Sequence, residues 1–224
     1  MRTKKAVINT MTSIMAEVVS IICGLILPRL ILGAFGSSYN GITSSITQFL
    51  SCIVLLRAGV GSVTRAALYN PLSKKDKSEI SGIVNATAIF MKKVALIYVG
   101  ALIVFACVYP FLVRNSFSWI FSATLVLIIG SSTFVDNYFG IAYQMLLQAD
   151  QKNYVNTIPQ IVTTILNTIV AAVLIHCGAG IHLVKLGSAI VYFIRPLFLS
   201  YYVKKKYEID ADLSLIHISE PTRP

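Results

Sequence analysis

Long apolar runs dominate the chain, and short polar segments separate them. A helix needs about 20 mainly apolar residues to cross the hydrocarbon core of a bilayer. Six segments meet this requirement and are predicted to be membrane spans: 10–33, 41–63, 91–113, 119–147, 158–176 and 181–203. The second span is the least apolar, and the fourth is long enough to project from the membrane. The pattern therefore predicts an all-α, polytopic membrane protein.

The composition agrees with this class of protein. The 224 residues are 56% hydrophobic and 12% charged, whereas soluble domains are about 25% charged. A net charge of +10 also suits nucleic-acid binding, but the basic residues gather at the ends of successive spans rather than on one soluble face. We therefore expect membrane lipids, and no nucleic acid, as partners. The four cysteines are isolated, which predicts neither a disulfide framework nor a zinc site.

The connections between the spans alternate in charge. Basic residues occupy the start of the chain, the connection at 64–82, the segment around Lys152 and the segment after the sixth span. The other three connections hold only Arg114. Basic connections face the cytoplasm in polytopic membrane proteins. The amino terminus and the end of the sixth span are thus predicted to be cytoplasmic.

Polar residues inside the spans recur every three or four positions, so the polar residues of one span share one helix face. Such stripes either line a hydrophilic path or, as is commoner for small polar residues, pack helices together. From the stripes we select Gln48 in the second span, Tyr143 in the fourth, Asn167 in the fifth, and Lys185, Tyr192 and Arg195 in the sixth as candidate substrate-binding residues.

Charged residues within the spans are the strongest functional signal. A charge at the bilayer centre costs about 2.5–3.5 kcal/mol on insertion scales and is usually turned towards protein or water. Arg29 and Arg57, in the first two spans, are therefore further candidates for substrate binding. Glu17 and Asp136 are candidates for ion coupling, and the alternative for both is a structural ion pair with an arginine of the spans. Lys185 and Arg29 lie nearer the outer surface, where they could also reach lipid headgroups.

The last twelve residues, LSLIHISEPTRP, differ abruptly in character from the preceding chain. They resemble the translation of a sequencing adapter. We therefore expect residues 213–224 to be an artefact, the native chain to continue past Asp212, and a carboxy-terminal lobe to be missing.

Three stretches together resemble a known family. They are LPRLILGAFGSSYNGITSSITQFLSCIVLLRAGVGSVTRAALYNPLSKKD, YFGIAYQMLLQADQKNYV and TILNTIV. In order and spacing they resemble Wzx-type polysaccharide flippases of the multidrug/oligosaccharidyl-lipid/polysaccharide exporter superfamily, which is MATE-like. The resemblance covers essentially residues 6–210.

The resemblance implies that the chain is the amino-terminal six-helix lobe of a two-lobe transporter in the bacterial cytoplasmic membrane. Such proteins move undecaprenyl-pyrophosphate-linked oligosaccharides to the outer leaflet by alternating access, and we expect a monomer at full length. Relatives in the superfamily place cationic residues on the first two helices for anionic lipid carriers, and Arg29 and Arg57 lie in comparable helices. We expect no cofactor, and a proton or sodium ion is the candidate coupling ion.

Two other functions remain open on the sequence. A multidrug cation exporter of the same superfamily would favour acidic cavity residues, whereas four basic residues and two acidic ones are embedded in the spans here, away from their ends. An intramembrane polysaccharide-modifying enzyme would need a catalytic constellation, and the chain shows no Ser/His/Asp set, no HExxH motif and no paired carboxylates. We therefore expect no enzymatic activity.

Overall fold

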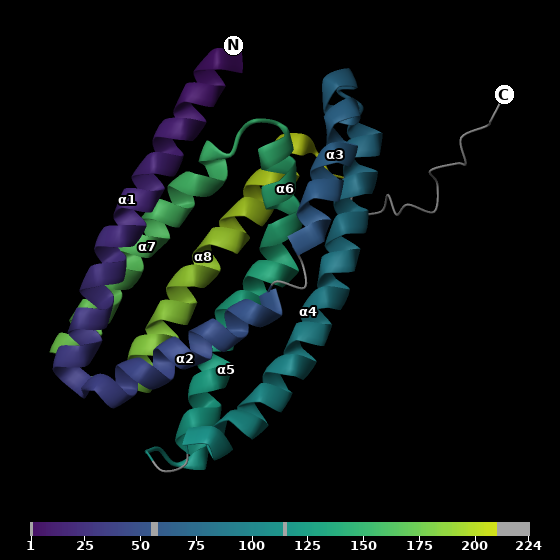
Figure 1. The fold of residues 1–224 in the computed structure, drawn as a ribbon. Helices are drawn as coiled ribbons and strands as arrows, with labels where there is room; N and C mark the ends of the chain where they lie inside the picture. The colour runs from purple at the N-terminus through teal and green to yellow at the C-terminus, as the bar shows by residue number, and fades with distance from the viewer. Residues whose placement is uncertain (1, 55–57, 114–115, 210–224) are drawn as a thin grey trace.

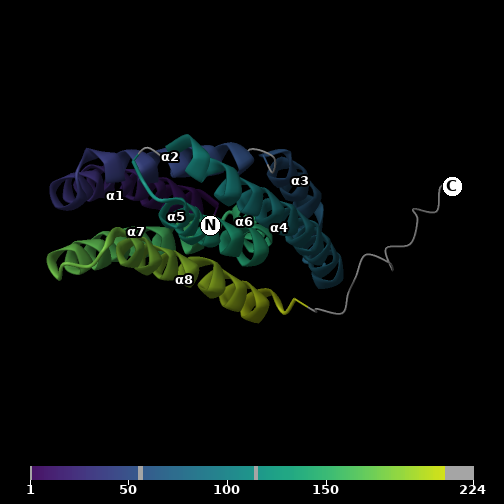
Figure 2. The same ribbon diagram turned by 90° about the horizontal axis from the view of Figure 1, so that it is seen from below.

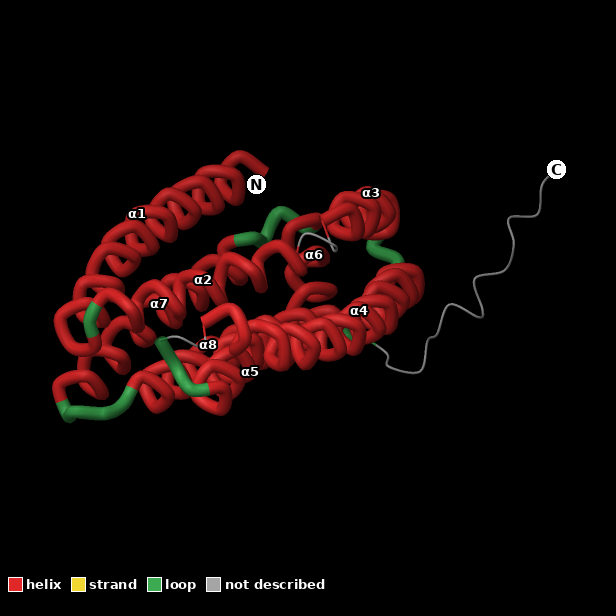
Figure 3. Tube along the Cα trace, turned by 60° about the horizontal axis from the view of Figure 1, so that its bottom comes forward, coloured by secondary structure: helices red, strands yellow, loops and turns green. Residues whose placement is uncertain are grey.

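The computed structural model describes residues 2–54, 58–113 and 116–209, and these ranges contain helices and short connections without a strand (Figure 3). The helices in chain order are α1 (Arg2–Phe35), α2 (Ser37–Val54), α3 (Ala58–Lys74), α4 (Lys77–Val113), α5 (Trp119–Val135), the π-helix η2 (Asp136–Gly140), α6 (Ile141–Ala149), α7 (Tyr154–His176) and α8 (Ile181–Tyr207). The predicted all-α class is confirmed for the described residues.

Five of the helical segments are long and apolar enough to cross a membrane: Lys5–Phe35, Lys77–Val113, Trp119–Ala149, Tyr154–His176 and Ile181–Tyr207. Their outer faces carry exposed apolar side chains such as Leu25 and Phe111, which are 72% and 64% exposed. Surfaces of this kind are stable when lipid covers them. The chain is therefore a multi-pass membrane protein.

The predicted second span, 41–63, does not form one described helix. α2 ends at Val54 and α3 begins at Ala58, with residues 55–57 outside the described part. The second predicted span, and with it the predicted total of six spans, is thus not confirmed. The connection predicted at 64–82 is almost wholly helical, because α3 and α4 occupy it. Asp76 restarts the helix by accepting a hydrogen bond from the Glu79 backbone N–H at 3.0 Å.

The helices pack in a continuous series. α1 packs along α7, α7 along α8, α8 on α5, and α5 on α4. Seen from below, α7 and α8 form one side of the molecule and α2 and α3 lie on the opposite side (Figure 2). On α4, residues Met91, Ala95, Tyr98 and Leu102 recur every three or four positions and are buried, which fixes the face that α4 turns inward.

Two apolar clusters hold the ends of this arrangement. Leu68, Leu146 and Leu199 join α3, α6 and α8 near the end where the chain starts. Ile46, Leu102 and Leu125 join α2, α4 and α5 towards the other end. Side chains in both clusters are buried, so apolar packing helps to position these helices.

The basic segments lie together at one end of the molecule. The start of α1, the α3–α4 connection, the α6–α7 loop and the end of α8 share the upper end in Figure 1, and the α1–α2 and α7–α8 connections share the lower end. At the lower end, α1 and α2 are separated by Gly36 alone, whose φ of 88° favours glycine. The described connections with and without basic residues therefore lie at opposite ends of the molecule, as the alternation of charge predicts.

Candidate functional site

A cavity of about 320 Å³ lies between α1, α2, α5, α7 and α8. Leu27 of α1, Leu50 of α2 and three apolar side chains of α5 and α8 form part of its wall. The polar side chains that line it are Thr47, Ser51, Ser132, Thr133, Asn167, Lys185, Ser188 and Tyr192. Four helices each contribute a polar group, so the cavity is where several of the predicted stripes meet.

Three of the predicted substrate-binding residues come together in this cavity. The Asn167 side-chain amide donates to the Tyr192 hydroxyl at 3.2 Å, and Lys185 lines the cavity two helical turns before Tyr192 on α8. Asn167 is only 3% exposed, and its Oδ1 has no hydrogen-bond partner among the described residues. An unpaired buried acceptor is costly, so this oxygen is well placed to accept a hydrogen bond from a ligand.

The hydroxyl groups of the cavity are partly satisfied by their own helices. Thr47 donates to the Thr43 carbonyl at 2.8 Å, and Ser51 donates to the Thr47 carbonyl at 2.9 Å. Ser132 and Ser188 donate to carbonyls one turn earlier in the same way. Each hydroxyl oxygen keeps lone pairs with which it can accept hydrogen bonds. The cavity is therefore rich in acceptors.

Lys185 supplies the charge of the cavity. It is the only charged side chain among the described residues that line it. Its ammonium group carries three donors and no acceptor. The combination of one cation, one free amide oxygen and several hydroxyls suits an anionic group that carries hydroxyls.

The sequence did not single out Thr47 or Thr133 as part of the site. Thr47 lies four residues before Ser51 and therefore on the same face of α2. Gln48, which was predicted in that stripe, is exposed on α2 and does not line the cavity. The spacing of four residues between Thr47 and Ser51 would have identified Thr47 as part of the site.

The charged residues of α1 lie outside the cavity. Glu17 and Arg29 are both exposed on that helix. Twelve residues separate them, which is about 18 Å along a helix, so they do not pair with each other. Arg57 lies outside the described residues.

Asp136 and Arg195 belong to a different polar region, beside the π-helix. The Gln144 side-chain amide donates to Asp136 Oδ1 at 2.9 Å. Arg195 donates to Asn156 Oδ1 through Nε at 3.2 Å and through Nη2 at 2.9 Å. Neither residue lines the cavity of Lys185, and Tyr143 lines a separate pocket between α4 and α8.

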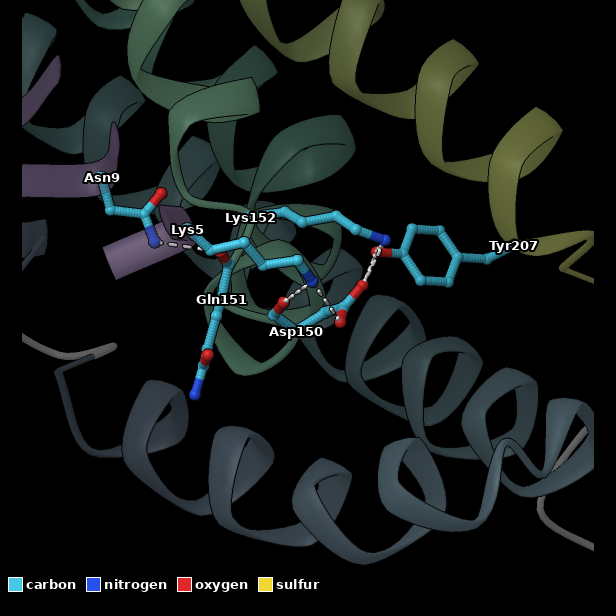
Figure 4. Close-up of polar contacts among 6 residues, drawn as sticks. All are labelled: Lys5, Asn9, Asp150, Gln151, Lys152 and Tyr207. Carbon is cyan, nitrogen blue, oxygen red and sulfur yellow. Dashed lines mark hydrogen bonds and ion pairs between the residues drawn. The ribbon is translucent and has the colours of Figure 1, made fainter. Parts of the chain in front are cut away.

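A third polar group, at the basic end, is structural (Figure 4). Asp150, in the α6–α7 loop, accepts a hydrogen bond from the Tyr207 hydroxyl of α8 and pairs with Lys152. Lys5 of α1 lies 3.7 Å from its other carboxylate oxygen, and Asn9 donates to the Gln151 carbonyl at 2.9 Å. The cluster therefore ties α1, the loop and α8 together.

The same contacts govern the ionisation of Asp150. Burial is the largest single influence and raises the pKa of this carboxyl group, but the hydrogen bonds from Lys152 and Tyr207 and the charges of Lys152 and Lys5 together outweigh it. The pKa of Asp150 therefore lies below its ordinary value. The carboxylate stays charged at neutral pH and holds the loop.

The described residues contain no group of three or more His, Cys, Asp or Glu side chains that could hold a metal ion. No protein-family model matches the chain, and a search of curated proteins and of solved structures likewise finds no match.

Proposed function

We propose that the chain is the amino-terminal lobe of a transporter that moves undecaprenyl-pyrophosphate-linked oligosaccharides across the bacterial cytoplasmic membrane by alternating access. The observation that carries the proposal is the cavity at membrane depth, in which Lys185 lies with Asn167, Tyr192 and several hydroxyls. The resemblance of the sequence to polysaccharide flippases supports the same function.

The position of Lys185 argues for a functional role. The residue lies one turn inside α8, a helix apolar enough to span the membrane. Insertion of a lysine is costly even where the side chain can reach the interface. A cavity that gives the ammonium group a polar environment and an anionic ligand offsets this cost.

The chemistry of the cavity fits the head of a lipid-linked sugar. A pyrophosphate is anionic, and Lys185 can donate to its oxygens. The free Oδ1 of Asn167 can accept from a sugar hydroxyl, and the Tyr192 ring offers an apolar face for the sugar. The volume lies at the lower end of the range for small-ligand sites, which suits the pyrophosphate with its first sugar rather than a whole oligosaccharide.

The same charge disfavours a multidrug cation exporter. A ligand cation 4 Å from Lys185 would be repelled by about 4 kcal/mol at an effective dielectric constant of about 20. No carboxylate among the described residues lines the cavity to compensate for this repulsion. A transported anion meets the opposite sign.

Within this proposal, a proton or sodium ion drives the cycle through Asp136. This carboxylate lies in the π-helix η2, where Gln144 and α8 surround it. π-Helical turns inside α-helices are frequent at functional sites. Glu17, which is exposed on α1, is the second candidate. Transport that continues unchanged after both residues are neutralised would contradict the coupling role.

Binding is the test that this chain allows, because the proposal assigns transport to two lobes. The chain is placed in nanodiscs and titrated with a fluorescent polyprenyl-pyrophosphate disaccharide. Lys185→Gln should weaken binding about 10-fold to 100-fold, since a hydrogen bond to a charged group contributes about 1.5–3 kcal/mol. Lys206→Gln, at the exposed end of α8, is the matched control and should bind normally.

Two results would contradict the proposal. One is equal binding of the pyrophosphate disaccharide and of a polyprenol disaccharide without phosphate. The other is tighter binding of a lipophilic cation such as tetraphenylphosphonium, which would favour the cation exporter. Circular dichroism of each variant shows whether the helices are retained, so that a folding defect is not mistaken for a loss of binding.

A further inference from the structure

A second pocket, of about 210 Å³, lies between α4, η2, α6 and α8 and shares no residue with the cavity of Lys185. Two lysines line it, Lys92 from α4 and Lys204 from α8. Its other polar side chains include Asn85, Asn137, Tyr138 and Ser200. Helices distant in the sequence therefore bring two cations to one pocket.

The depth of this pocket is given independently by two helices. Lys92 comes just before the apolar run 94–113, which is about 30 Å long as a helix and so matches the hydrocarbon core. Lys204 follows the apolar part of α8 directly, in the last turn of that helix. Both lysines thus lie at the level of the lipid headgroups.

The walls of the pocket combine charge with apolar surface. The Lys92 ammonium lies 5.4 Å from the centre of the Tyr138 ring, a cation–π contact that directs the side chain across the pocket. Ile89 and Phe139, which also line the pocket, are 47% and 38% exposed. No carboxylate among the described residues lines it. An anion with attached hydrocarbon would satisfy both features.

The π-helix brings part of this wall into place. Asn137, Tyr138 and Phe139 are consecutive residues of η2 and all line the pocket. A π-turn widens the helix locally and rotates the residues that follow it. The pocket is therefore a feature of the folded bundle, and the flexible ends of surface lysines alone do not create it.

We propose that this pocket binds the headgroup of an anionic phospholipid, with the phosphate diester between Lys92 and Lys204 and the acyl chains along the exposed faces of α4 and η2. Basic pockets between membrane helices at the headgroup level are suited to such lipids. The site is separate from the proposed transport cavity, and its occupation does not depend on the transported substrate.

Native mass spectrometry of the chain, released from nanodiscs that contain equal amounts of phosphatidylglycerol and phosphatidylcholine, tests the site. The wild-type chain should retain phosphatidylglycerol preferentially. Lys92→Gln with Lys204→Gln should reduce this preference about 25-fold, because each lysine near anionic lipid contributes about fivefold. Lys93→Gln with Lys206→Gln is the control, since it removes the same charge from neighbouring exposed positions outside the pocket.

The outcomes separate a built site from general attraction. Loss of the preference in the pocket pair alone supports the proposal. An equal loss in both pairs would overturn it, since charge near the membrane surface would then suffice. Displacement of the lipid by millimolar inorganic phosphate would also overturn it, because the pocket would then bind free phosphate. Lys92→Arg with Lys204→Arg should retain the preference and shows that the pocket is folded.

Discussion

Replacement of Asp150 by asparagine tests how the basic end of the molecule is held together. The substitution keeps the shape of the side chain and removes its charge. In the wild-type chain this carboxylate accepts from the Tyr207 hydroxyl at 2.5 Å and pairs with Lys152, and Lys5 lies 3.7 Å away. Three segments that are distant in the sequence therefore lose their common partner at once.

The expected loss of stability is about 2–3 kcal/mol. A hydrogen bond to a charged group contributes about 1.5–3 kcal/mol, and a neutral one about 0.5–1.5 kcal/mol, so replacing two of the former by the latter costs a few kcal/mol. The Asp150 and Lys152 side chains are 23% and 20% exposed, so water screens the pair in part and reduces the sum. The remaining penalty exceeds that of an ordinary surface pair.

The pH dependence of stability has a definite sign. Because the pKa of Asp150 is lower in the folded chain than its ordinary value of 3.8, its contribution is fully present above that ordinary value. The contribution is lost as the pH falls through the lower, folded pKa. The wild-type chain should therefore lose stability relative to Asp150→Asn as the solution is acidified from about pH 5 to about pH 3.

Unfolding in mixed detergent micelles, followed by far-ultraviolet circular dichroism, measures both effects. Glu208→Gln is the matched control, because Glu208 also pairs with a lysine at this end, Lys77, at 2.6 Å, but is exposed. It should change stability little. Equal losses in the two variants, or parallel acid dependence of Asp150→Asn and the wild-type chain, would refute the structural role of the cluster.

Two further predictions follow from the packing and from the topology. Gly140→Ala should destabilise the chain by about 1–3 kcal/mol through overpacking, because a Cβ there would lie 2.8 Å from Asp136 Oδ1. Gly100→Ala is the control, because a Cβ at that position meets open space and should cause no such loss. Equal unfolding midpoints for the two variants would contradict this prediction. A chain with Cys177 as its sole cysteine should react with a membrane-impermeant maleimide in intact cells. A chain with Ser73→Cys as its sole cysteine should react only after permeabilisation. The reverse pattern would show that the predicted orientation is wrong.

Much of the fold could be predicted because apolar length alone specifies membrane helices. The predicted spans at 10–33, 91–113, 158–176 and 181–203 each lie within one described helix. Boundaries were less predictable, since polar residues such as those of α3 continue a helix beyond the membrane as readily as they form a loop.

The site was predicted in part, and the π-helix explains where the prediction was incomplete. Ser132 and Tyr143 share a face if α-helical periodicity is continued along the fourth span, since eleven residues correspond to three turns. η2 lies between them, and its extra residue rotates the following part of the helix by about 100°. Ser132 therefore lines the cavity of Lys185, and Tyr143 lines the pocket of Lys92. Asn167, Lys185 and Tyr192 lie on uninterrupted helices, where the periodicity holds.

Under the proposed function, Glu17 is the residue whose surroundings most need a second lobe. It is exposed on α1, twelve residues from the start of the apolar segment Lys5–Phe35 and eighteen from its end. These spacings correspond to about 18 Å and 27 Å of helix, so its short side chain cannot reach either surface. A carboxylate at this depth costs about 2.5–3.5 kcal/mol on insertion scales unless protein or water surrounds it. The second lobe expected from the resemblance to flippases, or water in a path between two lobes, would supply that environment, and α1 would then face the transport path.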